Sequence, residues 1–233
     1  MKETRQRQLR DGAPATRTQV IPNGIHLERF ASAYAERSDH IPLVVGLIGR
    51  VVPIKDIKTF IRAIKETQYR LPGIEGWIIG PTEEDPDYVH ECQLLVESLE
   101  LQQHVKFLGM QNVVEMLPQL GLVALTSISE AQPLVLLEAM AAGVPVLASD
   151  VGSCREIIEG VTDEDRSLGN AGYVVPIASP GATAQAIIDI LQDPIHWQQR
   201  QAVGLQRVQR FYDEKLMFTR YQHIYEDTIL WPE

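Results

Sequence analysis

Cysteine is scarce in this chain, and no metal-ligand pattern accompanies it. Only Cys92 and Cys154 occur among 233 residues, and neither they nor the six histidines show the spacing of metal ligands. No apolar stretch approaches the roughly 20 residues of a membrane-spanning helix, and the start is too charged for a secretory signal. We therefore expect a soluble protein of the reducing cytoplasm that holds no metal.

Positive charge is scarce as well. The 21 lysines and arginines stand against 31 aspartates and glutamates, a formal net charge of -10. Nucleic-acid backbones are bound through an excess of Lys and Arg, so no nucleic-acid partner is expected. Residues 1–17 are the local exception, with four arginines and few acids. We interpret them as a solvated lead-in rather than a binding arm.

Motifs of several common enzyme classes are also missing. There is no Walker loop and no Gly-x-Gly-x-x-Gly opening a helix. Ser127 and Ser129 lack the nucleophile-elbow context of a serine hydrolase. Asp85-Pro86-Asp87 looks like the Asp-x-Asp of a metal-dependent class of sugar transferases, but a helix cap followed by Pro at the first helical position explains it better. Any phosphate site must therefore be assembled from separate loops.

The chain does contain short apolar runs that alternate with helical patterns, which predicts parallel strands joined by helical crossovers. Strands are expected at 19–21, 43–48, 76–79, 105–107, 122–125, 146–148 and 172–175. Helices are expected at 58–68, 87–99, 113–117, 133–142, 154–159, 182–191, 195–210 and 214–228. The predicted fold class is α/β, a doubly wound parallel sheet between about residues 19 and 191. Such sheets bind ligands beyond the carboxyl ends of the strands, where the strand order switches.

The loop after the strand at 43–48 offers two cations close together. It begins Gly49-Arg50 and reaches Lys55 five residues later. A guanidinium fork and an ammonium at one strand end can converge on two linked phosphates, and glycine lets backbone and ligand approach closely. An Arg and a Lys in a loop are also common surface residues, so this pattern alone is weak.

A second loop leads into the helix expected at 133–142. Pro133 suits the first helical position, where its missing amide proton costs nothing. Leu134 and Val135 then present free amides, and Gln132 before them is a poor capping residue. An anion from outside could satisfy those amides and the positive end of the helix dipole.

Two glutamates eight residues apart bracket this helix start. Glu130 lies in the loop, and Glu138 lies in the second turn of an otherwise apolar stretch, where a lone carboxylate is costly to bury. One could hold a ribose diol and the other a sugar; the alternative is a helix-end charge beside a solvated glutamate. Gly80, Met110 and Gln111 follow two other strands and could line the same crevice, although glycine after a strand is usually only a turn.

In this order, the residues resemble the C-terminal domain of family 4 retaining glycosyltransferases, which have the GT-B fold. The matching segments are 21–30, 49–55, 105–109, 130–146 and 152–157, so the resemblance covers nearly the whole chain from residue 19 onward. The variants at 129–135 and 150–156 are similar to the PelF branch, the cytoplasmic transferase of the Pel exopolysaccharide system of bacterial biofilms.

The resemblance implies a division of the chain and a set of roles. Residues 1–18 would lead in from a missing N-terminal acceptor domain, 19–210 would form the Rossmann-like nucleotide-sugar-binding domain, and 211–233 would form a helix that crosses back. Arg50 and Lys55 would hold the diphosphate, and Glu138 would bind the ribose. Glu130 would contact the donor sugar at the reacting centre. The other donor-site residues would be Gly49, Gly80, Met110, Gln111, Pro133, Leu134 and Val135, with positions 110 and 111 facing the base.

The resemblance also implies a metal-independent hexosyltransferase that takes UDP-glucose or a UDP-N-acetylhexosamine and extends a polysaccharide. Membrane-associated polysaccharide synthase proteins would be its partners. We expect the isolated domain to bind nucleotide and to be a poor catalyst. Gln132-Pro133 stands where many relatives have an aromatic-glycine pair, so contacts to the sugar can differ. The alternatives are a non-catalytic nucleotide-sugar-binding or interaction module, and a UDP-sugar epimerase, although epimerases lack the two spaced glutamates.

Overall fold

The computed structural model describes residues 2–37 and 40–229, and its centre is a six-stranded parallel sheet. The strands are β1 (Val44–Ile48), β2 (Glu75–Ile79), β3 (Val105–Gly109), β4 (Leu122–Leu125), β5 (Val146–Ser149) and β6 (Gly172–Val175). They lie in the order β3-β2-β1-β4-β5-β6. The order reverses between β1 and β4, which confirms the doubly wound α/β fold and places its switch point between these two strands.

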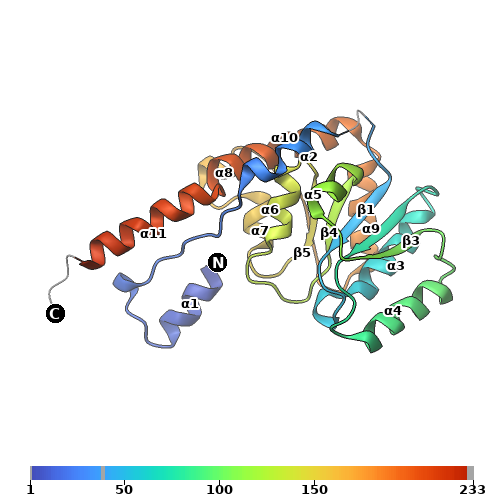
Figure 1. Cartoon of the computed structure of the whole chain (residues 1–233), viewed down its shortest axis with the longest axis horizontal. Helices are drawn as coiled ribbons and strands as arrows, with labels where there is room; N and C mark the ends of the chain where they lie inside the picture. Colours follow the sequence, from blue (N-terminus) through green and yellow to red (C-terminus); the bar gives the residue numbers. More distant parts are fainter. Residues whose placement is uncertain (1, 38–39, 230–233) are drawn as a thin grey trace.

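Helices cover both faces of the sheet, and each face has its own apolar core (Figure 1). One face carries α3 (Ile57–Gln68), α4 (Pro86–Ser98) and α9 (Pro180–Leu191), and the other carries α6 (Leu134–Ala141), α7 (Cys154–Glu159) and α10 (Pro194–Phe211). In β1, Val45 and Leu47 belong to the first core, whereas Val44 and Ile48 pack against the second. This alternation is the two-residue period of a strand.

Shorter helical segments complete the described part of the chain. They are α2 (Ala31–Ala35), α5 (Val113–Met116), α8 (Asp163–Arg166), η1 (Ala15–Arg17), η2 (Leu27–Phe30), η3 (Pro53–Lys55) and η4 (Leu117–Gln119). The region around α8 is anchored by Arg207 of α10, which is fully buried. Arg207 forms an ion pair of 2.6 Å with Asp165 and donates to the carbonyl of Gly169 at 2.7 Å.

The strand expected at 19–21 is wrong. Residues 18–24 are irregular, and the pairing in this region is a single bridge between Ile25 and Asp213. Pro22 has no amide proton to donate to a sheet ladder. The apolar Val20 and Ile21 instead line a hollow beside the last helix.

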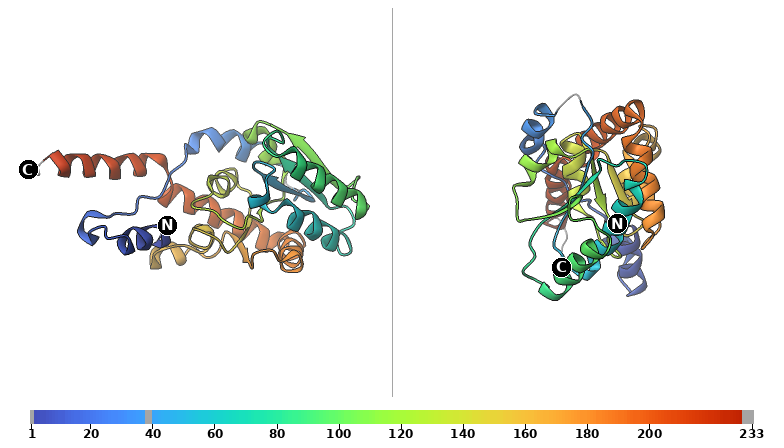
Figure 2. Two further views of the ribbon diagram at one scale, coloured as in Figure 1. Left: turned by 90° about the horizontal axis from the view of Figure 1, so that it is seen from below. Right: turned by 90° about the vertical axis from the view of Figure 1, so that its right-hand side faces the viewer.

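The two ends of the chain lie outside the sheet. α11 (Glu214–Ile229) projects away from the body of the domain, and residues 11–24 run back beside it from α1 (Lys2–Arg10) (Figures 1 and 2). On α11, Phe218, Tyr221 and Tyr225 are exposed, the last at 67%. The expectation that this helix contacts a further domain, like the boundaries at 18/19 and 210/211, stays a prediction.

Candidate functional site

The loops after β1 and β4 meet at the switch point of the sheet. The Thr126 hydroxyl lies 3.0 Å from the carbonyl oxygens of Lys55 and Asp56 and donates to them. The amide of Ile128 donates to the carbonyl of Ile54 at 2.9 Å. These bonds hold the two loops together beyond the carboxyl ends of their strands, which is where such folds bind ligands.

Lys55 and Glu130 form an ion pair across this junction. The Lys55 Nζ lies 2.5 Å from Glu130 Oε1, with 19% and 13% of the two side chains exposed. Lys55 ends η3, and the next residue, Asp56, has a left-handed backbone (φ 46°) and caps α3 by accepting from the Thr59 amide. Gly49 lies beside the Lys55 stem, and an added Cβ there would be in ordinary van der Waals contact with the Lys55 Cε, at 3.6 Å.

The loops after β1, β2 and β3 are also joined through their backbones. The Gly49 amide donates to the Ile79 carbonyl at 2.9 Å, and the Gly80 amide donates to the Gly109 carbonyl at 2.8 Å. Gly80 is buried with a φ of +148°, and an added Cβ would overlap the carbonyl of Gly49. Gly80 therefore serves this backbone contact, and its contact with a ligand stays a prediction.

Arg50 faces a different partner from Lys55. Its guanidinium NH1 contacts both carboxylate oxygens of Glu84, in the loop after β2, at 2.7 and 2.9 Å. About half of each side chain is exposed, at 54% and 50%. An exposed pair contributes only about 0–1 kcal/mol, so an anion at the switch point can compete for Arg50. The convergence of Arg50 and Lys55 on one diphosphate stays a prediction.

The start of α6 lies in the same region and has no side-chain cap. The helix begins at Leu134, and Pro133 is its N-cap residue with an extended backbone (φ -74°, ψ 108°). The expected assignment of Gln132 as cap and Pro133 as first helical residue is therefore wrong by one position. Leu134 and Val135 are therefore the first and second helical residues instead of the second and third. Their amides still face outward from the helix start because the first turn has no intrahelical acceptor.

The Gln132 side chain is engaged elsewhere, in an interaction that the sequence did not predict. Its amide group forms two hydrogen bonds with the backbone of Asn23. The loop after β5 supports the same segment, because the amide and hydroxyl of Ser153 donate to the Ala131 carbonyl at 3.0 and 2.9 Å. An added Cβ on Gly152 would overlap the backbone carbonyl of Glu130. The sequence feature that could have predicted this support is the Gly152-Ser153 pair that follows the apolar strand β5.

Glu138 is partly buried on α6, and burial raises the pKa of its carboxyl, partly offset by the positive charge of Arg29. Its side chain forms no hydrogen bond or ion pair with any residue in the described part of the chain. A carboxylate without a partner in an apolar stretch is available to a polar ligand, so its role with ribose stays a prediction with a physical basis.

Met110 and Gln111 follow β3, two strands away from the switch point on the side of β1. Met110 is 73% exposed, and the Gln111 side chain donates to the Leu108 carbonyl at 2.7 Å. They lie at the same edge of the sheet as the other loops, and contact with a base stays a prediction.

The assignment of Asp85 as the cap of a helix that begins at Pro86 is confirmed. Its carboxylate accepts from the Tyr88 amide at 3.0 Å, and Pro86 is the first residue of α4. Among the residues that the structure describes, no group of three His, Cys, Asp or Glu side chains could hold a metal ion. No helix in residues 2–37 or 40–229 is long and apolar enough to cross a membrane.

The fold is similar to those of several solved proteins. The C-terminal domain of a group 1 family glycosyl transferase (LpcC) from Francisella tularensis matches 82% of this chain and 99% of its own, with a TM-score of 0.67 and 22% identity. HepE from Anabaena, solved in complex with UDP-glucose, matches 97% of this chain and 62% of its own, with a TM-score of 0.83 and 22% identity. These likenesses establish a GT-B C-terminal fold.

Curated relatives are similar over most of this chain. The N-acetyl-alpha-D-glucosaminyl L-malate synthase of Bacillus anthracis is 29% identical over 195 residues, which are 82% of this chain and 46% of that protein. The phosphatidyl-myo-inositol mannosyltransferase of Mycolicibacterium smegmatis is 30% identical over 227 residues, 88% of this chain and 51% of that protein. The chain thus spans about half the length of these relatives. Residues 33–206 match the family of group 1 glycosyl transferases, and the chain belongs to that family.

Proposed function

We propose that this chain binds the UDP-sugar donor of a retaining hexosyltransferase at the switch point between β1 and β4. The observation that supports this proposal most directly is the ion pair of Lys55 with Glu130, where the loops after β1 and β4 contact each other. The HepE structures, which contain UDP, UDP-glucose, or UDP and glucose, support a uridine nucleotide as the ligand of this fold.

The diphosphate is held by the cations and the helix start. Lys55 exchanges part of its interaction with Glu130 for a phosphate oxygen, and Arg50 leaves its exposed pair with Glu84. The amides of Leu134 and Val135 add the positive end of the α6 dipole. These groups stabilise the negative charge that develops on the departing nucleotide without requiring a metal ion.

The two glutamates contact different parts of the donor, the ribose and the sugar. Glu138 accepts hydrogen bonds from the ribose hydroxyls, and Glu130 contacts the donor sugar near the reacting carbon. The backbone around Gly49 and Gly80 lets the donor approach closely, and Met110 with Gln111 borders the base. This division is consistent with the unpartnered carboxylate of Glu138 and with the switch-point position of Glu130.

The finer proposal is a role in Pel-type exopolysaccharide synthesis in bacterial biofilms. It is supported by the variants at 129–135 and 150–156. The enzyme then works in the cytoplasm beside membrane-associated synthase proteins, and UDP-glucose or a UDP-N-acetylhexosamine is the donor. A further domain supplies the acceptor site, so the chain alone binds the donor and transfers poorly.

A thermal-shift panel tests the proposal with UDP, UDP-glucose, UDP-N-acetylgalactosamine, ADP and GDP. A ligand at 100 times its Kd stabilises the folded state by about 2.7 kcal/mol, which raises the Tm of a domain this size by roughly 5–11 °C. We expect the uridine nucleotides to raise the Tm and the two purine nucleotides to raise it less. No shift with any uridine nucleotide overturns the proposal, and a stronger shift with ADP or GDP overturns the choice of base.

A further inference from the structure

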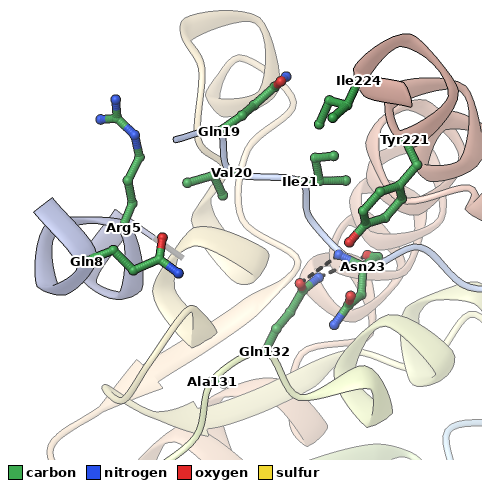
Figure 3. Close-up of a pocket in the computed structure, with 10 residues that line it drawn as sticks. All are labelled: Arg5, Gln8, Gln19, Val20, Ile21, Asn23, Ala131, Gln132, Tyr221 and Ile224. Atoms are coloured by element: carbon green, nitrogen blue, oxygen red, sulfur yellow. Dashed lines mark hydrogen bonds between the residues drawn. The ribbon is translucent and has the colours of Figure 1, made fainter. Parts of the chain in front are cut away.

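The loop that carries Glu130 is tied to a distant part of the chain by one side chain. The Asn23 amide donates to Gln132 Oε1 at 2.8 Å, and Gln132 Nε2 donates to the Asn23 carbonyl at 3.0 Å. Figure 3 shows Gln132 reaching from its loop to the Asn23 backbone, with the Tyr221 ring of α11 on the other side. A single amide side chain thus pairs with the Asn23 backbone as a neighbouring strand would, across 109 positions of sequence.

The segment that contains Asn23 is held on another side by the junction of α10 and α11. The Ile25 amide donates to the Tyr212 carbonyl at 2.9 Å, and the Glu214 amide donates to the Ile25 carbonyl at 3.1 Å. An added Cβ on Gly24 would lie 2.5 Å from the Glu214 Cα, so only glycine permits this contact. Residues 23–25 therefore connect the start of α11 to the loop before α6.

Gln132 lies between two proposed ligand-binding features of that loop, Glu130 and the start of α6. It lies two residues after Glu130 and directly before Pro133, the N-cap of α6. The loop is also anchored by the Ile128 amide on the Ile54 carbonyl and by Ser153 on the Ala131 carbonyl. Those two anchors lie within the sheet domain, whereas Gln132 extends the support to residues 18–24 outside it.

Asn23 is exposed and lines a hollow rather than a closed core. A cavity of about 340 Å³ opens beside the pair, and its walls include Val20, Ile21, Gln132 and Tyr221. Room on this scale lets the segment shift when the hydrogen bonds are lost. The two bonds are between neutral groups and partly solvent-accessible, so their loss should leave the fold of the sheet intact.

We propose that Gln132 is a positioning residue that couples the order of residues 19–25 and the start of α11 to ligand binding at the switch point. This inference rests on the proposed function, because the ligand is the nucleotide diphosphate held by Lys55 and the start of α6. Binding orders the loop from Glu130 to Pro133 and thereby strengthens the Gln132–Asn23 pair. Linkage is reciprocal, so ordering of the segment raises nucleotide affinity by the same factor.

Hydrogen exchange of the full chain with and without UDP tests the coupling. In the wild type, saturating UDP should slow exchange of the Asn23 amide, which is bonded to Gln132, and of the neighbouring amides to Ile25. Gln132→Met should speed that exchange without ligand and abolish the response to UDP, while weakening UDP binding roughly 3- to 10-fold. Gln132→Glu keeps the acceptor for the Asn23 amide and loses the donor, so it should fall between the two.

Gln185→Met is the matched control, because Gln185 donates to Asp189 within α9 at 2.8 Å, away from the loop. It should leave both the Asn23 response and UDP affinity unchanged. A Gln132→Met chain that keeps the wild-type response overturns the coupling, as does wild-type binding of UDP without any change at Asn23. Failure of the wild type to bind UDP overturns the proposed function and the coupling with it, so the two failures are distinguishable.

Discussion

The Nζ of Lys55 lies 2.5 Å from the Oε1 of Glu130, although the two residues are 75 positions apart and follow different strands. Both side chains are mostly shielded from water, with 19% and 13% exposed. Their charges therefore interact more strongly than those of a surface pair. The cation proposed to hold phosphate is thus paired with the carboxylate proposed to contact the sugar.

Removing that carboxylate charge should separate the two roles of the pair. Glu130→Gln frees Lys55 for phosphate, so affinity for UDP should rise by roughly 3- to 10-fold, or about 1 kcal/mol. Affinity for UDP-glucose should rise less or fall, because the sugar loses its contact. Calorimetry with both ligands measures the difference. As a control, Glu84→Gln frees the exposed Arg50 instead and should raise the affinity for UDP by a smaller factor. Equal losses of affinity for UDP and UDP-glucose in Glu130→Gln would contradict the assignment.

The raised pKa of Glu138 makes stability depend on pH. Because burial disfavours its charged form, the folded state binds this proton more tightly than the unfolded state does. The residue therefore costs no stability below its unfolded-state pKa, and the cost grows as pH rises through the folded-state pKa. Glu138→Gln should raise the Tm at pH 7, with a gain that disappears below about pH 4.

Melting curves across that pH range check this prediction, with Glu97→Gln on the exposed face of α4 as the control. The same Glu138→Gln chain should bind UDP more weakly, since a carboxamide is a weaker acceptor for ribose hydroxyls than a carboxylate. A lower Tm at pH 7 would mean instead that the ionised carboxylate is stabilised by Arg29.

The buried pair of Arg207 and Asp165 should matter for stability rather than for binding. Arg207 is fully buried and bonds to Asp165 at 2.6 Å and to the Gly169 carbonyl at 2.7 Å. Arg207→Met removes the counter-ion of a buried carboxylate and one donor to each of three backbone carbonyls, those of Ile158, Asp165 and Gly169. The expected cost is about 3–5 kcal/mol. The Tm should fall by roughly 6–20 °C.

The exposed Arg155, which pairs with Asp150 and Glu159, provides the control. Arg155→Met should cost about 0–1 kcal/mol. At a temperature where the Arg207 variant is still folded, its Kd for UDP should equal that of the wild type. A similar loss of Tm in both variants would show that the buried Arg207–Asp165 pair contributes no more to stability than the exposed pairs of Arg155.

Gly80→Ala should disturb both stability and the switch-point loops. A Cβ at Gly80 overlaps the Gly49 carbonyl, and the φ of +148° is itself strained for other residues, at about 1–3 kcal/mol. Gly109 offers a matched control, because it has a φ of +63° and no heavy atom within 4 Å of an added Cβ. Gly109→Ala should cost only about 1–2 kcal/mol. UDP affinity should fall in Gly80→Ala, and equal effects of the two substitutions would argue against the backbone contact.

The sheet and its loops could be predicted from the sequence because the strands have strong local signals. β4 and β5 are fully buried, and all of β4 and the first three residues of β5 are apolar. Asp85-Pro86 marks the start of α4 with a cap and a proline. Doubly wound parallel sheets bind ligands beyond the carboxyl ends of their strands, so the loops there could be identified as candidate sites before the strand order was known.

The pairings of individual side chains could not be predicted, because they depend on contacts between distant segments. Arg50 and Lys55 are neighbours in sequence, yet they face Glu84 and Glu130 on different loops. The strand expected at 19–21 was wrong because its apolar residues face a hollow beside α11 rather than the sheet. Gln132 was judged only as a cap, whereas its partner is a backbone segment 109 positions away.

The central claim, that Lys55 at the switch point holds the diphosphate, is tested most directly by the Kd for UDP in two lysine variants. Lys58 pairs with Glu91 on the outside of α3 and provides the matched substitution. Lys55→Ala should weaken UDP binding by about 1–3 kcal/mol, roughly 5- to 150-fold, and Lys58→Ala should leave it unchanged. Equal Kd values for the wild type and Lys55→Ala would contradict the account.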